Sequence, residues 1–332
     1  MPRNSLIILL VLCSPATLLF AQSSRSNTFY ATTLTRADAK RWPDVNSWIA
    51  TVYRQDSVKL YDVVKEVPYD SPFPSIQTSD ENGRSVVLNA CEGWVEFYDG
   101  QGNRITRWSP FVDQSPDYER ILKCSLSADR AAFVVSSPGM QPARVVLTDL
   151  YGTTMMEASL KGKMAGEIFL SADGSYIVAG SYTSDDRIEL VTSVLDQHGI
   201  IQHELPVLFR HADVSDDSKE VVLSDRNRIV TVPVDGRTQG FSWTTDSKDD
   251  VITGVRFAGE HVAVVVERAS VMTGVPIYKD PSLRIFAASG RMLMSRQMNG
   301  SSARAASLQV DERAIVVRSD RALLRVERDQ LK

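Results

Sequence analysis

Several charged side chains recur at one position of a repeated pattern, where they could bind a ligand together. Glu119 and Arg120, then Glu167, then Arg210 and His211, each stand at the start of a short apolar run. If these runs are the inner strands of a radial array, their starts converge on a central channel. Glu, Arg and His side chains gathered there could hold an anionic or zwitterionic ligand. Solvation explains the same residues without any ligand, because water fills the entrance of such a channel.

Three carboxylates of the same set allow a catalytic alternative. Glu119, Glu167 and Asp213 could hold a divalent metal at the channel mouth of a hydrolase or lyase. Nucleophilic catalysis is not indicated, because the chain has no Gly-x-Ser-x-Gly elbow. No catalytic, cofactor or metal motif is present, so we expect no cofactor. A non-catalytic binding role is favoured over the enzyme.

The four histidines do not form a compact set of metal ligands. His198 and His203 have Asp196 and Glu204 nearby, but their spacing along a strand and turn does not bring all four together. His261 begins an apolar run and is expected to pack or to form a hydrogen bond. We therefore expect solvated turn residues rather than a metal site.

An irregular insertion adds an apolar surface to the pattern. Residues 269–282 add about a dozen residues where other repeats use a few, and long loops on a rigid scaffold often carry function. Folding down onto the ring is the alternative. The predicted binding face combines this loop with the charged positions: Tyr118, Glu119, Arg120, Glu167, Arg210, His211, Met272, Ile277, Tyr278 and Lys279.

The elements that position these residues are predicted by a repeated turn. Asp129, Asp173 and Asp217 recur 44 residues apart, each two positions after a serine and directly before a β-branched run. Ser and Asp side chains accept backbone N–H groups in tight turns, so each copy closes a hairpin. A period in the forties built from strand signals is typical of a propeller.

Six repeats of four strands are expected from residue 75 onward. The second strand of each is a continuous apolar run, which is typical of strands buried on both faces between stacked sheets. These second strands are predicted at residues 85–88, 132–135, 177–179, 221–223, 262–266 and 314–317. An Asp-Gly or Asp-x-x-Gly turn follows most third strands and leads into a more polar fourth strand. The sequence therefore predicts an all-β, six-bladed β-propeller of four-stranded blades.

The two ends of the array predict how the ring closes. The last repeat has three strands, and an early strand at residues 58–67 has no repeat of its own. We expect that early strand to complete the last blade, which removes the free sheet edges. Ahead of it, apolar residues at helical spacing from Val45 to Tyr53 predict a short helix over residues 45–55. The domains are then a signal peptide (1–21), an N-terminal extension with a helix (22–57) and the propeller (58–332).

The turn motifs resemble the WD40-like and TolB-type repeats of exported bacterial propellers. Residues 171–174 with 196–199 match best, and residues 127–129 with 149–152 come next. The resemblance covers roughly residues 58–332 and implies a propeller fold with a general binding role. The chain lacks the Gly-His…Trp-Asp signature of true WD40 repeats and a large α/β domain ahead of the ring. The envelope partners of TolB are therefore not implied.

The amino terminus and the net charge of the chain limit the classes of partner that we expect. Arg3 precedes an apolar stretch that ends near Ala21, which predicts a secretory signal peptide and a periplasmic or secreted product. The formal net charge of −4 over 332 residues becomes −5 without residues 1–21, because Arg3 is their only charged residue. No basic cluster or second apolar span is present. We therefore expect a protein or a small anionic ligand as partner, no nucleic acid and no membrane span in the mature form.

Two cysteines remain after the signal peptide. Cys91 and Cys124 fall in neighbouring repeats, on a second and a first strand. A disulfide bond is open to them in an oxidising compartment, and two small buried side chains are the alternative.

Overall fold

The computed structural model describes residues 28–36, 48–56, 62–69, 75–78, 84–100, 103–112, 115, 117, 119–127, 129–137, 140–183, 188–234, 240–272, 275–320 and 322–331. For residues 28–78, 140–141, 272 and 275 it describes the backbone only. The predicted signal peptide and Tyr118 lie outside the described residues. Among the described residues, no helix is both long enough and apolar enough to cross a membrane.

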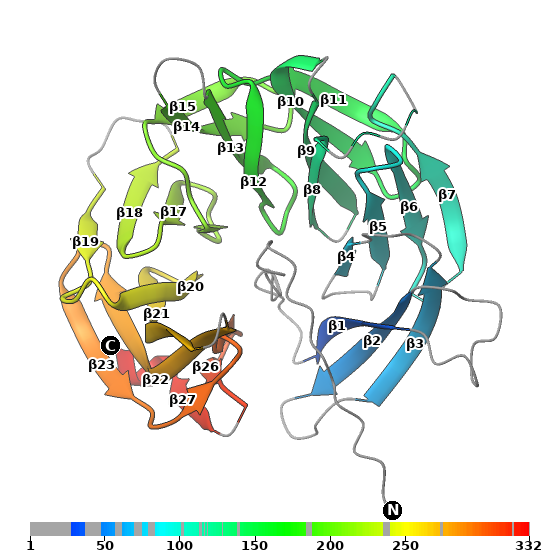
Figure 1. The fold of residues 1–332 in the computed structure, drawn as a ribbon. Coiled ribbons are helices and arrows are strands. Elements are labelled where there is room, and N and C mark those ends of the chain that lie inside the picture. Colours follow the sequence, from blue (N-terminus) through cyan, green and yellow to red (C-terminus); the bar gives the residue numbers. More distant parts are fainter. Residues whose placement is uncertain are drawn as a thin grey trace, which may run out of the picture.

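Seven antiparallel sheets follow one another around a centre, in the order of the sequence (Figure 1). The first strand of each sheet contacts the first strand of the next sheet along the chain. Within each sheet consecutive strands pair, so every sheet is a meander joined by hairpins. The all-β propeller class and the four-stranded blade are thus confirmed.

Five of the seven sheets contain four consecutive strands. They are β4 (Ser75–Thr78), β5 (Ser85–Asn89), β6 (Trp94–Tyr98), β7 (Arg104–Trp108); β8 (Ile121–Leu126), β9 (Arg130–Ser137), β10 (Met140–Asp149), β11 (Thr154–Ser159); β12 (Met164–Leu170), β13 (Tyr176–Thr183), β14 (Glu189–Asp196), β15 (Ile201–Leu205); β16 (His211–Val214), β17 (Glu220–Ser224), β18 (Arg228–Pro233), β19 (Ser242–Thr244); and β20 (Asp250–Ala258), β21 (His261–Met272), β22 (Val275–Ala287), β23 (Met292–Gln297).

The first and last sheets have three strands each. They are β1 (Thr28–Arg36), β2 (Trp48–Asp56), β3 (Asp62–Tyr69); and β25 (Ser307–Val310), β26 (Ala314–Arg318), β27 (Leu323–Glu327). The short strand β24 (Ser301–Ser302) pairs with β22, and a 3₁₀ turn, η1 (Arg328–Leu331), follows β27.

The second strands are buried on both faces, as their continuous apolar runs predict. On β9, Phe133 packs into one hydrophobic cluster with β5 and β6, whereas Ala132 and Val134 pack into another with β12 and β13. Similar clusters lie between the following sheets. The core is therefore a series of layers between neighbouring sheets rather than a single centre.

The Ser-x-Asp turns are held by their own side chains. The Ser171 hydroxyl donates a hydrogen bond to Asp173 Oδ1 at 2.6 Å and accepts one from the Tyr176 amide at 2.9 Å. Ser215 forms the same pair of bonds with Asp217 and the Glu220 amide. Because the serine both donates and accepts, it closes each turn at the point where the second strand begins.

The Asp-x-x-Gly turns lie where the third strand gives way to the fourth. Asp196 Oδ1 accepts the amides of His198 and Ile200, and Gly199 has a φ of +82°. A Cβ at Gly199 would lie 3.0 Å from Met156 Sδ on β11 of the preceding sheet. This turn thus needs glycine both for its backbone conformation and for close packing between sheets.

The N-terminal part differs from its prediction in two respects. Residues 48–56, within the predicted helix, form strand β2, which pairs with β1 along its whole length. The early strand, β3, pairs with β2 and not with β27, so it does not complete the last sheet. The predicted closure and the helix are therefore wrong, and residues 28–69 add a seventh sheet to the six predicted units.

Both cysteines are free thiols. Cys91 lies in the turn between β5 and β6, and Cys124 is buried on β8. Burial raises the pKa of both thiols, which lowers their reactivity.

We predict that Ser171→Ala destabilises the protein by about 1 to 3 kcal/mol, because it leaves the Tyr176 amide and Asp173 without their shared partner. Ser175→Ala is the matched control, since Ser175 bonds the same carboxylate from an exposed position and should cost about 0.5 kcal/mol or less. Urea unfolding measures both. An equal decrease in the free energy of unfolding in the two variants would contradict the structural role of the repeated serine.

Candidate functional site

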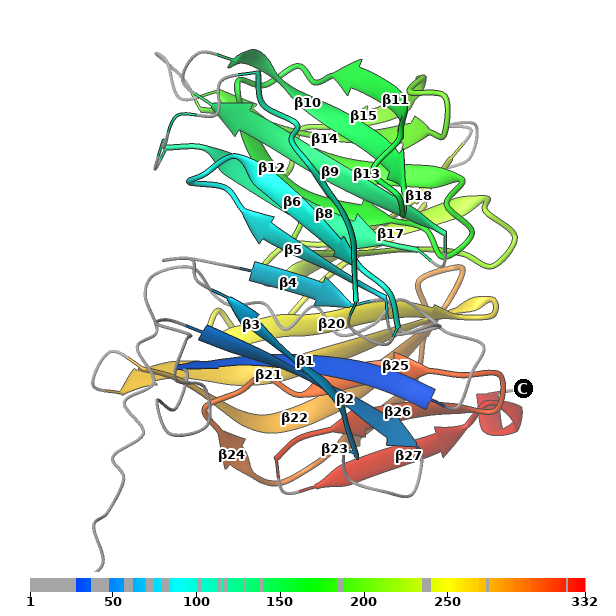
Figure 2. The same cartoon turned by 90° about the vertical axis from the view of Figure 1, so that its right-hand side faces the viewer.

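The charged candidates lie on one side of the ring, as their shared repeat position predicts. Glu119 and Arg120 precede β8, Glu167 lies on β12, and Arg210 and His211 stand at the start of β16. The inner strands run in one direction, so these residues share the side on which β5 and β21 end, at the left of Figure 2. Their side chains nevertheless have different surroundings.

Arg120 is a structural residue in this arrangement. Its guanidinium lies over the ring of Phe111, 4.9 Å from the centroid, and Nη1 donates to the carbonyl oxygen of Cys91 at 3.3 Å. The side chain is buried, whereas the neighbouring Glu119 is exposed. Of this pair, Glu119 is therefore the residue that faces solvent.

Glu167 forms an ion pair across two sheets. Its carboxylate accepts a hydrogen bond from Lys123 on β8, the first strand of the preceding sheet. Both side chains are about one-third exposed. Lys123 was not among the predicted residues, although its position 44 residues before Glu167 is the repeat distance. The pair neutralises the charge expected from Glu167 alone.

Arg210 and His211 carry different charges at neutral pH. Arg210 is exposed, and its amide donates to the carbonyl oxygen of Ser224 at 2.6 Å. Burial, with the nearby guanidinium groups of Arg256 and Arg210, lowers the pKa of His211 to about 4. His211 is therefore neutral at pH 7, and Arg210 supplies the positive charge at this point of the face.

Asp213 lies deeper, between β16 and β20. Its Oδ2 accepts the backbone amide of Phe257 at 2.8 Å, and burial raises the pKa of the carboxyl to about 6 although Arg256 opposes the shift. The Arg256 guanidinium donates to the carbonyl oxygens of Ala212 and Val255. Asp213 therefore joins two neighbouring sheets and is not available at the channel mouth.

The three carboxylates of the catalytic alternative do not assemble. Glu119 is exposed, Glu167 is paired with Lys123, and Asp213 is buried against Phe257. In the part of the chain that the structure describes, no group of three or more His, Cys, Asp or Glu side chains could hold a metal ion. The geometry thus offers no support for a metal-assisted reaction at these residues.

The predicted loop at 269–282 is instead an extension of a β-hairpin. β21 and β22 pair as far as Met272↔Val275, well beyond Arg268, where the pairing of β21 with β20 ends. Strand β24 pairs with β22 at Tyr278 and Lys279 and flanks its base. In Figure 2 this hairpin extends past the neighbouring sheets at the left. The loop was predicted because residues 269–282 exceed the connection in the other repeats, whereas the extra residues lengthen two paired strands.

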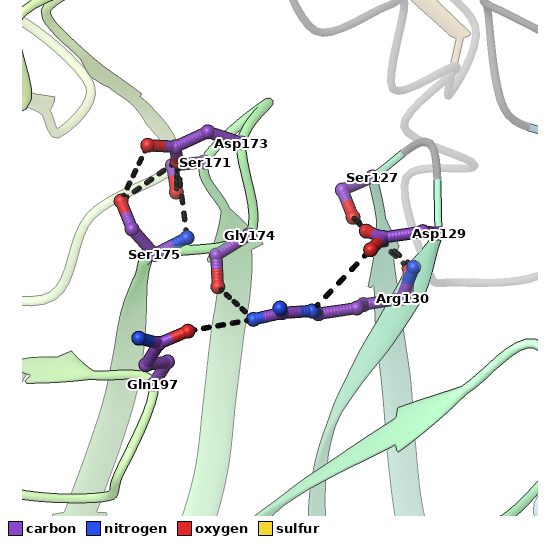
Figure 3. A network of polar contacts seen from close by, with 8 residues as sticks. All are labelled: Ser127, Asp129, Arg130, Ser171, Asp173, Gly174, Ser175 and Gln197. Carbon is purple, nitrogen blue, oxygen red and sulfur yellow. Dashed lines mark hydrogen bonds and ion pairs between the residues drawn. The ribbon is translucent and has the colours of Figure 1, made fainter.

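The opposite side of the ring carries a polar connection between sheets that the sequence analysis missed (Figure 3). Arg130 Nη1 donates to the carbonyl oxygen of Gly174 at 3.1 Å and to Gln197 Oε1 at 2.9 Å, both on the next sheet. Ser218, one sheet further, donates to Asp173 at 3.1 Å. These turns are thus linked to one another across three successive sheets.

Comparisons with known proteins agree with the fold. No protein-family model and no curated protein sequence matches the chain. A chain in the crystal structure of the mitotic checkpoint complex is 10% identical with a TM-score of 0.53, over 83% of this chain and 86% of that one. The structure of apo AztD from Citrobacter koseri is 11% identical with a TM-score of 0.58, over 94% of this chain and 83% of that one. These likenesses, with the repeated sheets, show that the chain has the β-propeller fold.

We predict that Asp213→Asn removes a pH dependence of stability. The folded pKa of about 6 exceeds the unfolded value of about 3.9, so the contribution of Asp213 to stability falls as pH rises from 4 to 6 and stays low above 6. The loss amounts to about 2 to 3 kcal/mol. Asparagine still accepts the Phe257 amide, whereas Asp213→Ala does not and should be less stable than Asn at every pH. Urea unfolding from pH 4 to 8 measures the free energy of unfolding of each variant. If that free energy depends on pH as steeply in Asp213→Asn as in the wild type, the prediction is contradicted.

Proposed function

We propose that this chain is an exported β-propeller that binds a partner protein without catalysing a reaction. The binding face is the side of the ring that carries Glu119, Arg210 and the tip of the β21–β22 hairpin. The hairpin is the observation that carries the proposal. Its strands continue past Arg268, where β20 stops pairing, and they expose Val271 at 75%.

The extended hairpin is costly unless it contacts something. Two-stranded ribbons gain little stability on their own in water, and exposed β-branched residues at an open edge invite association. Strand pairing up to Met272↔Val275 and the flanking β24 hold the exposed Val271 in a defined position, as a recognition element requires. An apolar tip on a rigid scaffold is well suited to a protein surface.

The charges around the hairpin favour a protein over a small anion. His211 is neutral at pH 7, Glu167 is neutralised by Lys123, and exposed Glu119 and Arg210 have opposite signs. Charges of both signs therefore lie on this face among the described residues, and mixed charge around an apolar element is typical of protein interfaces. One of the similar solved structures named above is that of a protein complex.

We predict that shortening the hairpin abolishes partner binding and leaves the fold intact. Residues 270–277 are replaced by Asn-Gly, which joins the register partners Ala269 and Tyr278 through a two-residue turn. A photocrosslinking amino acid at Val271 should give a discrete adduct in envelope extract, identified by mass spectrometry. When added in excess, the shortened protein should not prevent the full-length protein from forming this adduct. It should keep the wild-type unfolding midpoint.

The matched control places the same crosslinker at Tyr151, which is 62% exposed in the turn after β10, on the opposite side of the ring. No adduct is expected there. Equal adducts at both positions, or full competition by the shortened protein, would overturn the proposed face.

A separate experiment tests export. Expression of the full chain in a bacterial host should give a protein outside the cytoplasm whose first residue is Gln22, because residues 1–21 have the charge and apolar pattern of a signal peptide. Cell fractionation and N-terminal sequencing measure this. A protein that stays in the cytoplasm with Met1 or Pro2 at its amino terminus would contradict export.

A further inference from the structure

The last sheet ends on a strand that occupies an interior position in other sheets. The third strands β6, β10, β14, β18 and β22 each pair with a second strand on one side and a fourth strand on the other. β27 is also a third strand, but within the described residues it pairs with β26 alone. Its outer edge therefore presents backbone groups that fourth strands cover elsewhere.

The register shows which residues present these groups. Ser319 N–H bonds the carbonyl oxygen of Ala322, and Arg328 N–H bonds that of Arg313, at the two ends of the β26–β27 ladder. Residues at alternate positions bond the same neighbour in an antiparallel pair, so residues 322, 324, 326 and 328 face β26. Leu323, Arg325 and Glu327 accordingly direct their N–H and C=O groups outward.

The same three residues carry the exposed side chains of the strand. Leu323 is 55% exposed, and the side chains of Arg325 and Glu327 are 41% and 43% exposed. Arg325 Nε donates to Glu327 Oε1 at 2.7 Å, so both charged groups lie on one face of the sheet. Val326 is buried on the other face, in the cluster shared with β21 and β22. The edge thus combines backbone groups that no described strand pairs with, together with one positive and one negative charge.

We propose that β27 pairs with β27 of a second copy of this chain, antiparallel, about a two-fold axis that passes beside Val326. In this register Arg325 lies opposite the partner's Glu327, and Glu327 lies opposite Arg325 of the partner subunit. Each of these pairs exchanges two backbone hydrogen bonds, and the two three-stranded sheets become one continuous sheet. The proposal concerns the rim of the ring and is independent of the binding face described above.

Charge complementarity favours a second copy of the chain and this register. Opposite charges directly across an antiparallel pair stabilise it, and like charges there destabilise it. Two-fold pairing centred on Val326 places every Arg325 beside a Glu327, whereas pairing centred on Arg325 would set two guanidinium groups against each other. A two-fold axis perpendicular to the sheet also keeps all four charged groups on one face, so the pairs within and between the copies form one network.

The test uses charge reversal on the full mature protein, with analytical ultracentrifugation across a concentration series. Wild type should form a dimer at high concentration. Arg325→Glu and Glu327→Arg should each weaken self-association about tenfold or more, because each sets like charges opposite one another. An equimolar mixture of the two variants should associate again, since every facing pair is then opposite in charge. The double reversal R325E/E327R should also dimerise.

A backbone variant separates edge pairing from a general surface effect. Arg325→Pro removes an outward N–H and keeps the bonds to β26, so the monomer should stay folded by circular dichroism and lose association. A wild type that is monomeric at every concentration, or a mixture that fails to associate, would overturn the proposal. Protection of the amides of Leu323, Arg325 and Glu327 from hydrogen exchange in a monomer would overturn it too, since a segment of the same chain would then cover the edge.

Discussion

Burial of the second strands on both faces is the constraint on which the rest of this structure depends. Phe133 of β9 packs toward the preceding sheet, and Ala132 and Val134 pack toward the following one. Burying a side chain such as Val or Phe stabilises a fold by about 1.5 to 3 kcal/mol, so a single sheet left with one such face in water would be unstable. Each sheet therefore needs a neighbour on either side, and a twisted stack of such sheets curves around a centre.

The stack is fixed at its inner edge by hydrogen bonds that follow the repeat distance. Ser125 accepts the amide of Leu170 on the next inner strand, and Asp213 accepts that of Phe257 in the same way. Glu267 accepts the amide of Ala306 just before β25, and burial raises the pKa of its carboxyl. Inner strands have no neighbour in their own sheet on that side, so Ser125 and Asp213 bond backbone amides that the ladder within the sheet does not use.

This role of the acidic residues limits what the centre of the ring can do. A carboxylate whose lone pairs bond an adjacent sheet is a poor metal ligand, and its movement would disturb the packing of two sheets. The sequence suggested a channel carboxylate at Asp213 because the residue lies on the first strand of a repeat, and the first strands surround the central channel. Two repeats earlier, Ser125 stands at the equivalent position and also accepts an amide of the next sheet. The position therefore holds a hydrogen-bond acceptor between sheets rather than a catalytic group.

Most of the repeat architecture could be predicted from the sequence, because turn chemistry and apolar runs are local signals. The predicted second strands at 132–135 and 262–266, for example, lie within β9 (Arg130–Ser137) and β21 (His261–Met272). The stripe from Val45 to Tyr53 misled because a nine-residue strand, Trp48–Asp56, can carry apolar residues at helical spacing by chance. The partner of β3 was mispredicted because residues 45–55 were expected to be a helix, which left no neighbouring strand in the sequence for β3, whereas β2 provides one as a local hairpin. The Lys123–Glu167 pair was equally hidden, although both residues stand at the repeat distance.

The second strand of the last sheet, β26, is buried less evenly on its two faces than the second strands of the inner sheets. In β26, Ile315 and Val317 are fully buried in the cluster with β21 and β22, whereas on the other face Ala314 is fully buried but Val316 and Arg318 are only partly buried. Second strands inside the stack have no such alternation, as the uniform burial of Ala131 to Val135 shows. Terminal units of a repeat array commonly carry a more polar outer face because no further unit covers it. Among the described residues, this face of β26 is therefore covered less completely than the face toward β21 and β22, although the strands of the last sheet pair as regularly as the others.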